Sequence, residues 1–264
     1  MSGADISEAA RTRTADIVSA LGSMGSLSTP SRLPGWSRLT VACHLRYGAV
    51  ASLRVTADAL AGRMTSFYPG GRAAVRPGTL EPGPCESQAE VVASLGEESA
   101  KLHDSWARLA ESEWQTVSHE PGDNRDLGET SIASLAALRL TEVEVHGYDL
   151  DIGLDDWSDV FVKKVLPVRI GRLAARRTNH KAVDPDVQGT WKLVARDGPS
   201  WRISVRGDVV TTEAVDTEAP ADAVIEATGR DLLAMLLGRP LDGEVVTRGD
   251  TRLAGLFSRA FPGP

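Results

Sequence analysis

The chain is poor in cysteine, with only Cys43 and Cys85 among its 264 residues. Two widely spaced cysteines exclude the disulfide framework on which many small secreted domains depend. Cys43 precedes His44 directly, but consecutive residues of a helix do not share a face. We therefore expect Cys43 to fill the core as a small apolar residue and not to act as a metal ligand.

The sequence also lacks long apolar runs and an excess of positive charge. No run approaches the roughly 20 apolar residues of a membrane span, and residues 1–8 lack the basic and apolar regions of a signal peptide. Lys and Arg number 29 against 36 Asp and Glu, for a formal net charge of -7, whereas a general nucleic-acid binder usually carries a basic surface. No Gly-rich phosphate-binding motif occurs. These absences predict a cytoplasmic protein that binds neither nucleic acid nor membrane.

What the sequence does contain is the pattern of a folded helical protein. Hydrophobic residues make up 42% and charged residues 25% of the chain, as in ordinary globular domains. Apolar residues recur at helical spacing in four segments, and Ser37 and Ser87 are suitable first caps for two of them. The expected helices cover about 6–21, 37–61, 87–109 and 131–153. Four helices with long connections predict a bundle.

Two features complicate this bundle. Residues 64–86 are rich in proline and glycine and are read as irregular; a connection this long is either functional or mobile. It is read either as a flap that carries Phe67 and Tyr68 toward a ligand or as a surface loop without such a role. After Trp157 a fifth helix is expected, which Pro167 should kink or end.

The last third of the chain has a different character. Apolar β-branched and aromatic runs with turn residues between them predict strands at about 191–195, 201–205, 209–213, 223–227 and 243–247. A short helix capped by Thr228 ends at Gly238, and another is expected over residues 252–257. The predicted fold is therefore α + (α+β): a helical bundle over residues 1–175 and a small α+β domain over residues 185–264.

The fourth helix carries an unusual set of polar residues on a largely apolar stripe. Glu142 and His146 are four residues apart, so their side chains project from one face, one turn apart. This spacing lets one helix offer an oxygen and a nitrogen ligand to a cation, and His44 is the best candidate for a third ligand. The alternative is a surface ion pair that only stabilises the helix.

Two segments resemble the mycothiol-dependent maleylpyruvate isomerase family, which belongs to the DinB-like metal-binding four-helix bundles. The first is Leu33-Pro34-Gly35-Trp36-Ser37 with Val41 and His44-Leu45. The second has the pattern R-x-x-E-x-x-x-H-x-x-D-L, met by Arg139, Glu142, His146, Asp149 and Leu150. The resemblance covers the whole chain. It implies that His44, Glu142 and His146 bind zinc and that the thiol mycothiol is a cosubstrate.

The resemblance also suggests roles for three further residues. Arg139 and Asp149 flank the expected ligands. In one interpretation they orient the ligands or bind the thiol. In the other they form salt bridges with each other or with a neighbouring helix and only stabilise the bundle. Arg239, at the end of the short helix, resembles a position from which an arginine reaches an interdomain cleft and acts in catalysis. The alternative for Arg239 is an exposed arginine at a helix end.

Three functions fit these observations, for a monomer or small homo-oligomer. The first is a zinc-dependent enzyme that activates mycothiol as a thiolate for S-transfer to, or thiol exchange on, a small electrophilic metabolite. The second is cis–trans isomerisation of maleylpyruvate, in which the thiolate adds, the bond rotates and the thiol leaves. The third is a non-enzymatic metal-binding module. We favour the first, because the family is broader than its founding activity.

Overall fold

The computed structural model describes residues 2–121, 127–174, 177 and 183–263. The chain divides into two compact units, Met1–Phe161 and Val162–Pro264. The domain break expected between residues 175 and 185 falls largely on residues outside the described part. The helix α6, Asp159–Gly171, runs through the division that the contacts indicate, and Arg169 donates a hydrogen bond to the backbone oxygen of Leu236 in the second unit.

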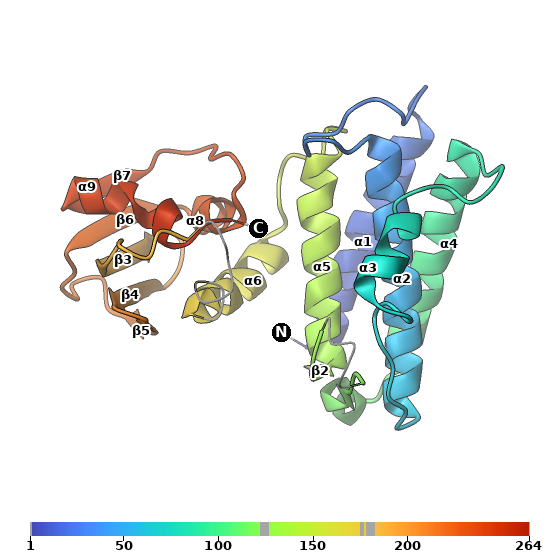
Figure 1. Cartoon of the computed structure of the whole chain (residues 1–264), viewed down its shortest axis with the longest axis horizontal. Coiled ribbons are helices and arrows are strands. Elements are labelled where there is room, and N and C mark those ends of the chain that lie inside the picture. Colours follow the sequence, from blue (N-terminus) through green and yellow to red (C-terminus); the bar gives the residue numbers. More distant parts are fainter. Residues whose placement is uncertain (1, 122–126, 175–176, 178–182, 264) are drawn as a thin grey trace. The chain divides into compact units, whose positions relative to one another are not determined.

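The first unit is built on four long helices, α1 (Gly3–Gly22), α2 (Arg38–Leu60), α4 (Gln88–Ala107) and α5 (Ile132–Asp149). Helices α1 and α2 each pack against both α4 and α5 (Figure 1). The side chains of Ser37, Ser87 and Ser131 accept hydrogen bonds from the first-turn backbone, as good N-caps do. The structure confirms the expected fold class of a helical bundle followed by a small sheet domain.

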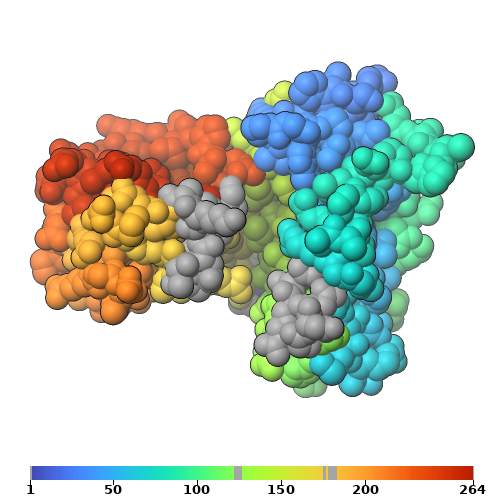
Figure 2. All heavy atoms as spheres, viewed as in Figure 1, coloured from blue at the N-terminus to red at the C-terminus, as the bar shows by residue number. Residues whose placement is uncertain are grey.

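The connections contain more regular structure than their composition predicts. Residues 64–86 include a helix, α3 (Arg72–Thr79), that holds Pro77 inside it. The expectation of an irregular segment was wrong, because Ala73 and Ala74 favour the helix locally. In Figure 2 this teal segment lies over α2. The next connection forms a 3-10 turn, η1 (Glu111–Gln115), and two short paired strands, β1 (Val117–Ser118) and β2 (Thr130–Ser131).

Helix α6 also continues past its proline. Pro167 lacks a backbone N–H and was expected to kink or end the helix, but the helix runs on to Gly171. Val165, Leu166 and Ile170 are buried on both sides of the proline. We infer that this burial outweighs the loss of one backbone hydrogen bond.

The second unit is a five-stranded sheet with short helices. The strands are β3 (Gly189–Ala195), β4 (Ser200–Arg206), β5 (Val209–Val215), β6 (Ala223–Ala227) and β7 (Val246–Gly249), in the order β5-β4-β3-β6-β7. Only the β3–β6 pair is parallel. The helices are α8 (Gly229–Leu237), α9 (Thr251–Gly255) and α10 (Phe257–Ala260). Among all described residues, no helix has the length and apolar character to cross a membrane.

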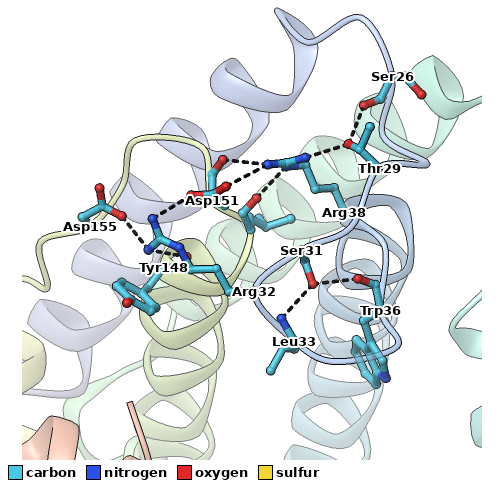
Figure 3. A network of polar contacts seen from close by, with 11 residues as sticks. Ser26, Thr29, Ser31, Arg32, Leu33, Trp36, Arg38, Tyr148, Asp151 and Asp155 are labelled. Carbon is cyan, nitrogen blue, oxygen red and sulfur yellow. Dashed lines mark hydrogen bonds and ion pairs between the residues drawn. The ribbon is translucent and has the colours of Figure 1, made fainter. Parts of the chain in front are cut away.

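A polar network joins the loop before α2 to the end of α5 (Figure 3). Arg32 donates hydrogen bonds to the backbone oxygen of Tyr148 and to the carboxylates of Asp151 and Asp155, and its guanidinium lies 4.2 Å from the centre of the Tyr148 ring. Arg38 donates to the backbone oxygens of Leu150 and Asp151. The network therefore holds together the two segments that carry the family motifs, although about 110 residues separate them in sequence.

Replacing Arg38 by alanine is expected to lower the free energy of unfolding by about 1.5 kcal/mol, the lower end for hydrogen bonds to charged groups. The lower end applies because the Asp151 carboxylate is half exposed. Arg63→Ala is the matched control, since Arg63 pairs with Asp58 with 62% of its side chain exposed and should cost at most about 1 kcal/mol. Urea denaturation of both variants measures the difference, and equal losses would contradict the prediction.

Candidate metal centre

The candidate ligands come from two neighbouring helices. His44 lies in the second turn of α2, and Glu142 and His146 lie one turn apart near the end of α5. The packing of α2 on α5 and the Arg32 and Arg38 network bring these turns together. Sequence spacing alone places Glu142 beside His146, whereas only the bundle places His44 beside both.

The three side chains form a compact cluster of possible ligand atoms. Nε2 of His44 lies 2.8 Å and Nε2 of His146 lies 3.4 Å from the same oxygen, Oε2 of Glu142. One ligand atom from each of the three residues lies within 4.8 Å of the others. A single carboxylate oxygen thus faces two imidazole nitrogens, and a divalent cation coordinated by all three would occupy the space where these atoms converge.

Two further residues hold the imidazole rings in place. Oδ2 of Asp149, whose side chain is 1% exposed, lies 2.9 Å from Nδ1 of His146. This contact leaves Nε2 of His146 directed to Glu142, as in the carboxylate–histidine–metal arrangement of many metal sites. The Trp36 ring stacks on His146 at 6.4 Å between centroids and meets His44 edge-on at 5.5 Å. The rings therefore have little freedom to turn.

The electrostatics of the cluster differ between its members. Burial disfavours charge on His146, but hydrogen bonds to Asp149 and Glu142 outweigh it and raise its pKa to about 9. Burial lowers the pKa of His44 in spite of its bond to Glu142. For Glu142, burial acts to raise the pKa, and the two histidines lower it well below its usual range. The raised pKa of His146 favours a ring that is protonated between Asp149 and Glu142, so a cation that coordinates its Nε2 would have to displace a proton.

Arg139 does not pair with Asp149. It is 2% exposed and crosses the bundle, donating hydrogen bonds to the backbone oxygen of Leu45 in α2 (2.7 Å) and to Oγ of Ser99 in α4 (3.0 Å). Burial lowers the pKa of this guanidinium to about 10. Arg139 thus links three helices directly behind the ligand cluster.

Arg239 belongs to the second unit. It follows the left-handed Gly238 that ends α8, and its Nη1 donates a hydrogen bond of 2.9 Å to the backbone oxygen of Leu237. Its catalytic role stays a prediction that rests on the family resemblance.

A cavity of about 160 Å³ lies beside the cluster in the first unit. His44 and Glu142 form part of its wall, together with Tyr47, Phe67 and Tyr68. The predicted approach of Phe67 and Tyr68 to a ligand is therefore compatible with where they lie. Sequence reasoning missed Tyr47, although it follows His44 by three residues and so shares its helix face.

Arg72 is a second residue of the cavity wall that sequence reasoning missed. It lies on α3, inside the segment that was read as irregular. No local pattern in the sequence predicts that this helix contributes to a wall of the cavity.

Comparison with known proteins decides the family. The model of the mycothiol maleylpyruvate isomerase N-terminal domain matches residues 7–151, more than half of the chain. The chain belongs to this family. The match confirms the resemblance read from the Leu33–Leu45 and Arg139–Leu150 segments. Membership in the mycothiol maleylpyruvate isomerase family supports an enzyme, an isomerase or a relative of one.

The family model covers only the first unit, whereas the similarity to solved structures includes the second unit as well. A crystal structure of the mycothiol-dependent maleylpyruvate isomerase matches with a TM-score of 0.67 and 17% identity, over 94% of this chain and 93% of that chain. A histidine-to-alanine mutant of that isomerase matches over the same shares with a TM-score of 0.68 and 17% identity. At this identity the likeness shows the fold. No curated protein sequence matches the chain.

Proposed function

We propose that this protein is a zinc-dependent enzyme that uses mycothiol for S-transfer to, or thiol exchange on, a small electrophilic metabolite. The observation that carries the proposal is the convergence of His44, Glu142 and His146, with ligand atoms within 4.8 Å of one another. Membership in the mycothiol maleylpyruvate isomerase family supports the choice of thiol.

The donor set fits zinc. Two imidazole nitrogens and one carboxylate oxygen are ligands that zinc prefers, and three protein ligands leave a position open for an exogenous group. Zinc held there would supply a positive charge that converts a bound thiol to its thiolate at neutral pH. The chain's own residues prepare the site: Asp149 orients His146, Trp36 packs on both histidines, and Arg139 stiffens the bundle behind them.

The thiol must come from outside the chain. Neither Cys43 nor Cys85 belongs to the ligand cluster among the described residues. Cys43 is buried, and burial raises the pKa of its thiol to about 11, so it stays protonated. An external low-molecular-weight thiol is therefore the nucleophile in this proposal, and mycothiol is the one that the family uses.

Isomerisation of maleylpyruvate is the second candidate. It is favoured because the family, and the solved structure that shares the fold, are both named for this activity. Both reactions begin when the thiolate sulfur forms a bond to an electrophilic carbon of the substrate. In transfer, a leaving group departs from that carbon with the electron pair of its own bond. In isomerisation, the π electron pair of the carbon–carbon double bond moves onto the conjugated carbonyl oxygen, the resulting single bond rotates, and the pair re-forms the double bond as the same sulfur leaves. A non-enzymatic module would need no cavity beside its ligands, and the cavity lined by His44 and Glu142 therefore favours an enzyme.

Cobalt substitution tests the thiolate step. Addition of mycothiol to the cobalt-loaded protein should produce a thiolate-to-metal charge-transfer band, and its apparent affinity should increase as pH rises toward the thiol pKa of about 8.5, because thiolate binding releases a proton. His146→Ala should abolish the band. Arg239→Ala should retain it and slow turnover of an anionic substrate.

A cobalt spectrum unchanged by mycothiol, or equal mycothiol binding by metal-free protein, would reject the thiolate proposal. Incubating the zinc-loaded enzyme with mycothiol and a panel of electrophiles that includes maleylpyruvate then separates transfer from isomerisation. A stable thioether product indicates transfer, and a trans product with mycothiol recovered indicates isomerisation.

A further inference from the structure

The cavity beside the candidate metal centre has a wall of three aromatic rings. Tyr47 and Tyr68 are stacked with centroids 5.1 Å apart, and Phe67 meets both edge-on, at 6.1 and 5.3 Å. Leu127 and Leu138 add further apolar surface. This surface suits a flat apolar group, because aromatic rings pack well against one another. At about 160 Å³ the cavity has room for one small ring system, since a cavity of about 150 Å³ can hold benzene.

Several polar groups of this wall are already engaged within the protein. The Tyr47 hydroxyl donates a hydrogen bond of 2.8 Å to the backbone oxygen of Phe67. The guanidinium of Arg72 lies 5.3 Å from the centre of the Tyr68 ring. Arg139 directs its hydrogen bonds to α2 and α4. The aromatic surface is therefore the main feature that this part of the wall offers to a ligand.

The hydroxyl group of Ser52 differs from these groups. Ser52 is only 3% exposed and belongs to the same wall, and among the described residues its hydroxyl forms no hydrogen bond. A buried hydroxyl without a partner costs free energy, and the large majority of buried polar side-chain atoms in folded proteins have one. A ligand atom that accepts a hydrogen bond from Ser52 would supply the missing partner.

Helix geometry places Ser52 in line with the metal ligand on α2. His44, Gly48 and Ser52 follow at intervals of four residues and so share one face of the helix. Eight helical residues span about 12 Å, so His44 and Ser52 lie at opposite ends of this stretch. Gly48 places no side chain between them, and a Cβ there would lie 3.2 Å from Nη1 of Arg139. A ligand whose acceptor meets Ser52 can therefore extend along α2 toward the metal ligands.

We infer that the cavity binds a small flat apolar group with one uncharged hydrogen-bond acceptor, such as a carbonyl oxygen, which accepts a hydrogen bond from Ser52. That this group belongs to the electrophile of the reaction rests on the proposed function; that the cavity binds such a group does not. The inference makes Ser52 a specificity-determining residue. Any charge that the electrophile carries then lies outside this cavity.

NMR titration of the zinc-loaded, full-length protein with three probes of similar shape tests the inference. Acetophenone has the flat ring and a carbonyl oxygen, α-methylstyrene replaces that oxygen by a CH₂ group, and benzoate carries a charge in its place. Acetophenone should bind most tightly. Its affinity should exceed that of α-methylstyrene about fivefold, the net effect of one neutral hydrogen bond.

Ser52→Ala tests the assigned donor. It should weaken acetophenone about fivefold and leave α-methylstyrene unchanged. The thermal unfolding midpoint should not fall, because the hydroxyl loses no partner within the protein; a merely structural role would lower the midpoint and would not distinguish the two probes. Ser94→Ala is the matched control, since Ser94 is a half-buried serine of α4 that is not part of this wall. It should change neither affinity.

A second variant tests the location independently of the hydrogen bond. Leu138 forms part of the wall and is only half-buried, so Leu138→Trp should fill the cavity without disturbing the core. It should abolish binding of both acetophenone and α-methylstyrene while zinc content and the thermal unfolding midpoint stay unchanged.

Equal affinity for acetophenone and α-methylstyrene, or a difference that persists in Ser52→Ala, would overturn the role of Ser52. Benzoate binding more tightly than acetophenone would overturn the uncharged acceptor. Acetophenone binding that is unchanged in Leu138→Trp would place the group elsewhere. These results are separate from the cobalt spectrum with mycothiol. A protein that binds acetophenone as described but gives no thiolate band would reject the proposed function and retain this inference.

Discussion

Alanine at His44, Glu142 or His146 is expected to eliminate stable zinc binding. Each substitution removes one of the three proposed protein ligands, so the loss should exceed the roughly 10- to 100-fold that removal of an outer hydrogen-bonding partner costs. Zinc content after dialysis against a weak chelator measures the effect, and circular dichroism shows whether each variant remains folded. The wild-type protein should retain about one zinc per chain.

The matched controls for these substitutions are His119→Ala and Glu129→Ala. His119 and Glu129 are a second histidine–carboxylate pair in the first unit, with 56% and 80% of their side chains exposed and 3.5 Å between Nδ1 and Oε1. Both variants should retain full zinc content. Full occupancy in all three ligand variants, or equal loss in the controls, would show that the metal lies elsewhere.

Arg13→Ala is expected to destabilise the protein by about 3–5 kcal/mol, because it leaves a buried carboxylate without its partner. Glu144 is only 1% exposed, and its Oε2 lies 3.2 Å from Nε of Arg13. Arg13 also donates hydrogen bonds to the backbone oxygens of Leu154 and Asp156. Chemical denaturation at pH 8 measures the loss in the free energy of unfolding.

The pH dependence of this variant follows from the Glu144 pKa. Burial raises this pKa, and hydrogen bonds from Ser158 together with the Arg13 charge partly oppose the rise. Removing Arg13 should raise it further. A carboxyl group with a folded-state pKa above its unfolded value takes up a proton in the folded state first, so the folded state gains relative stability as pH falls through that range. The decrease in the free energy of unfolding caused by Arg13→Ala should therefore be smaller at pH 5 than at pH 8.

Two comparisons isolate the buried charge. Arg11→Ala removes an arginine from the same helix whose pair with Glu8 is more than half exposed, so it should cost far less stability than Arg13→Ala. Adding Glu144→Gln to Arg13→Ala should recover part of the loss, because the uncompensated charge is gone. Equal losses in Arg11→Ala and Arg13→Ala would contradict the buried-pair interpretation.

Local sequence patterns were sufficient for the long helices and for the sheet domain. The apolar spacing and the serine caps that predict helices near residues 6–21 and 37–61 lie on α1 and α2, because periodicity and capping are properties of a few consecutive residues. The same local rules failed at α3, where the composition predicted an irregular segment and a helix forms. At Pro167 they allowed the helix to end, and α6 continues to Gly171.

Two of the three candidate ligands could likewise be placed side by side from the sequence alone. Glu142 and His146 share a helix face through their spacing, and Asp149 follows His146 by three residues, so these contacts need only the helix itself. The wall residues Tyr47 and Arg72, and the partners of Arg139, depend on how separate helices pack. Patterns among a few consecutive residues cannot predict those contacts.

The sequence by itself thus determined the four long helices of the bundle, the family and which side chains of α5 point together. Only the tertiary structure decided that His44 meets Glu142, 98 residues away, and that Glu144 faces Arg13. Helical geometry places residues three and four apart on one face without any other part of the chain. A contact between distant residues requires that the burial of apolar faces and the Arg32 and Arg38 network outweigh the entropy lost when the intervening chain closes.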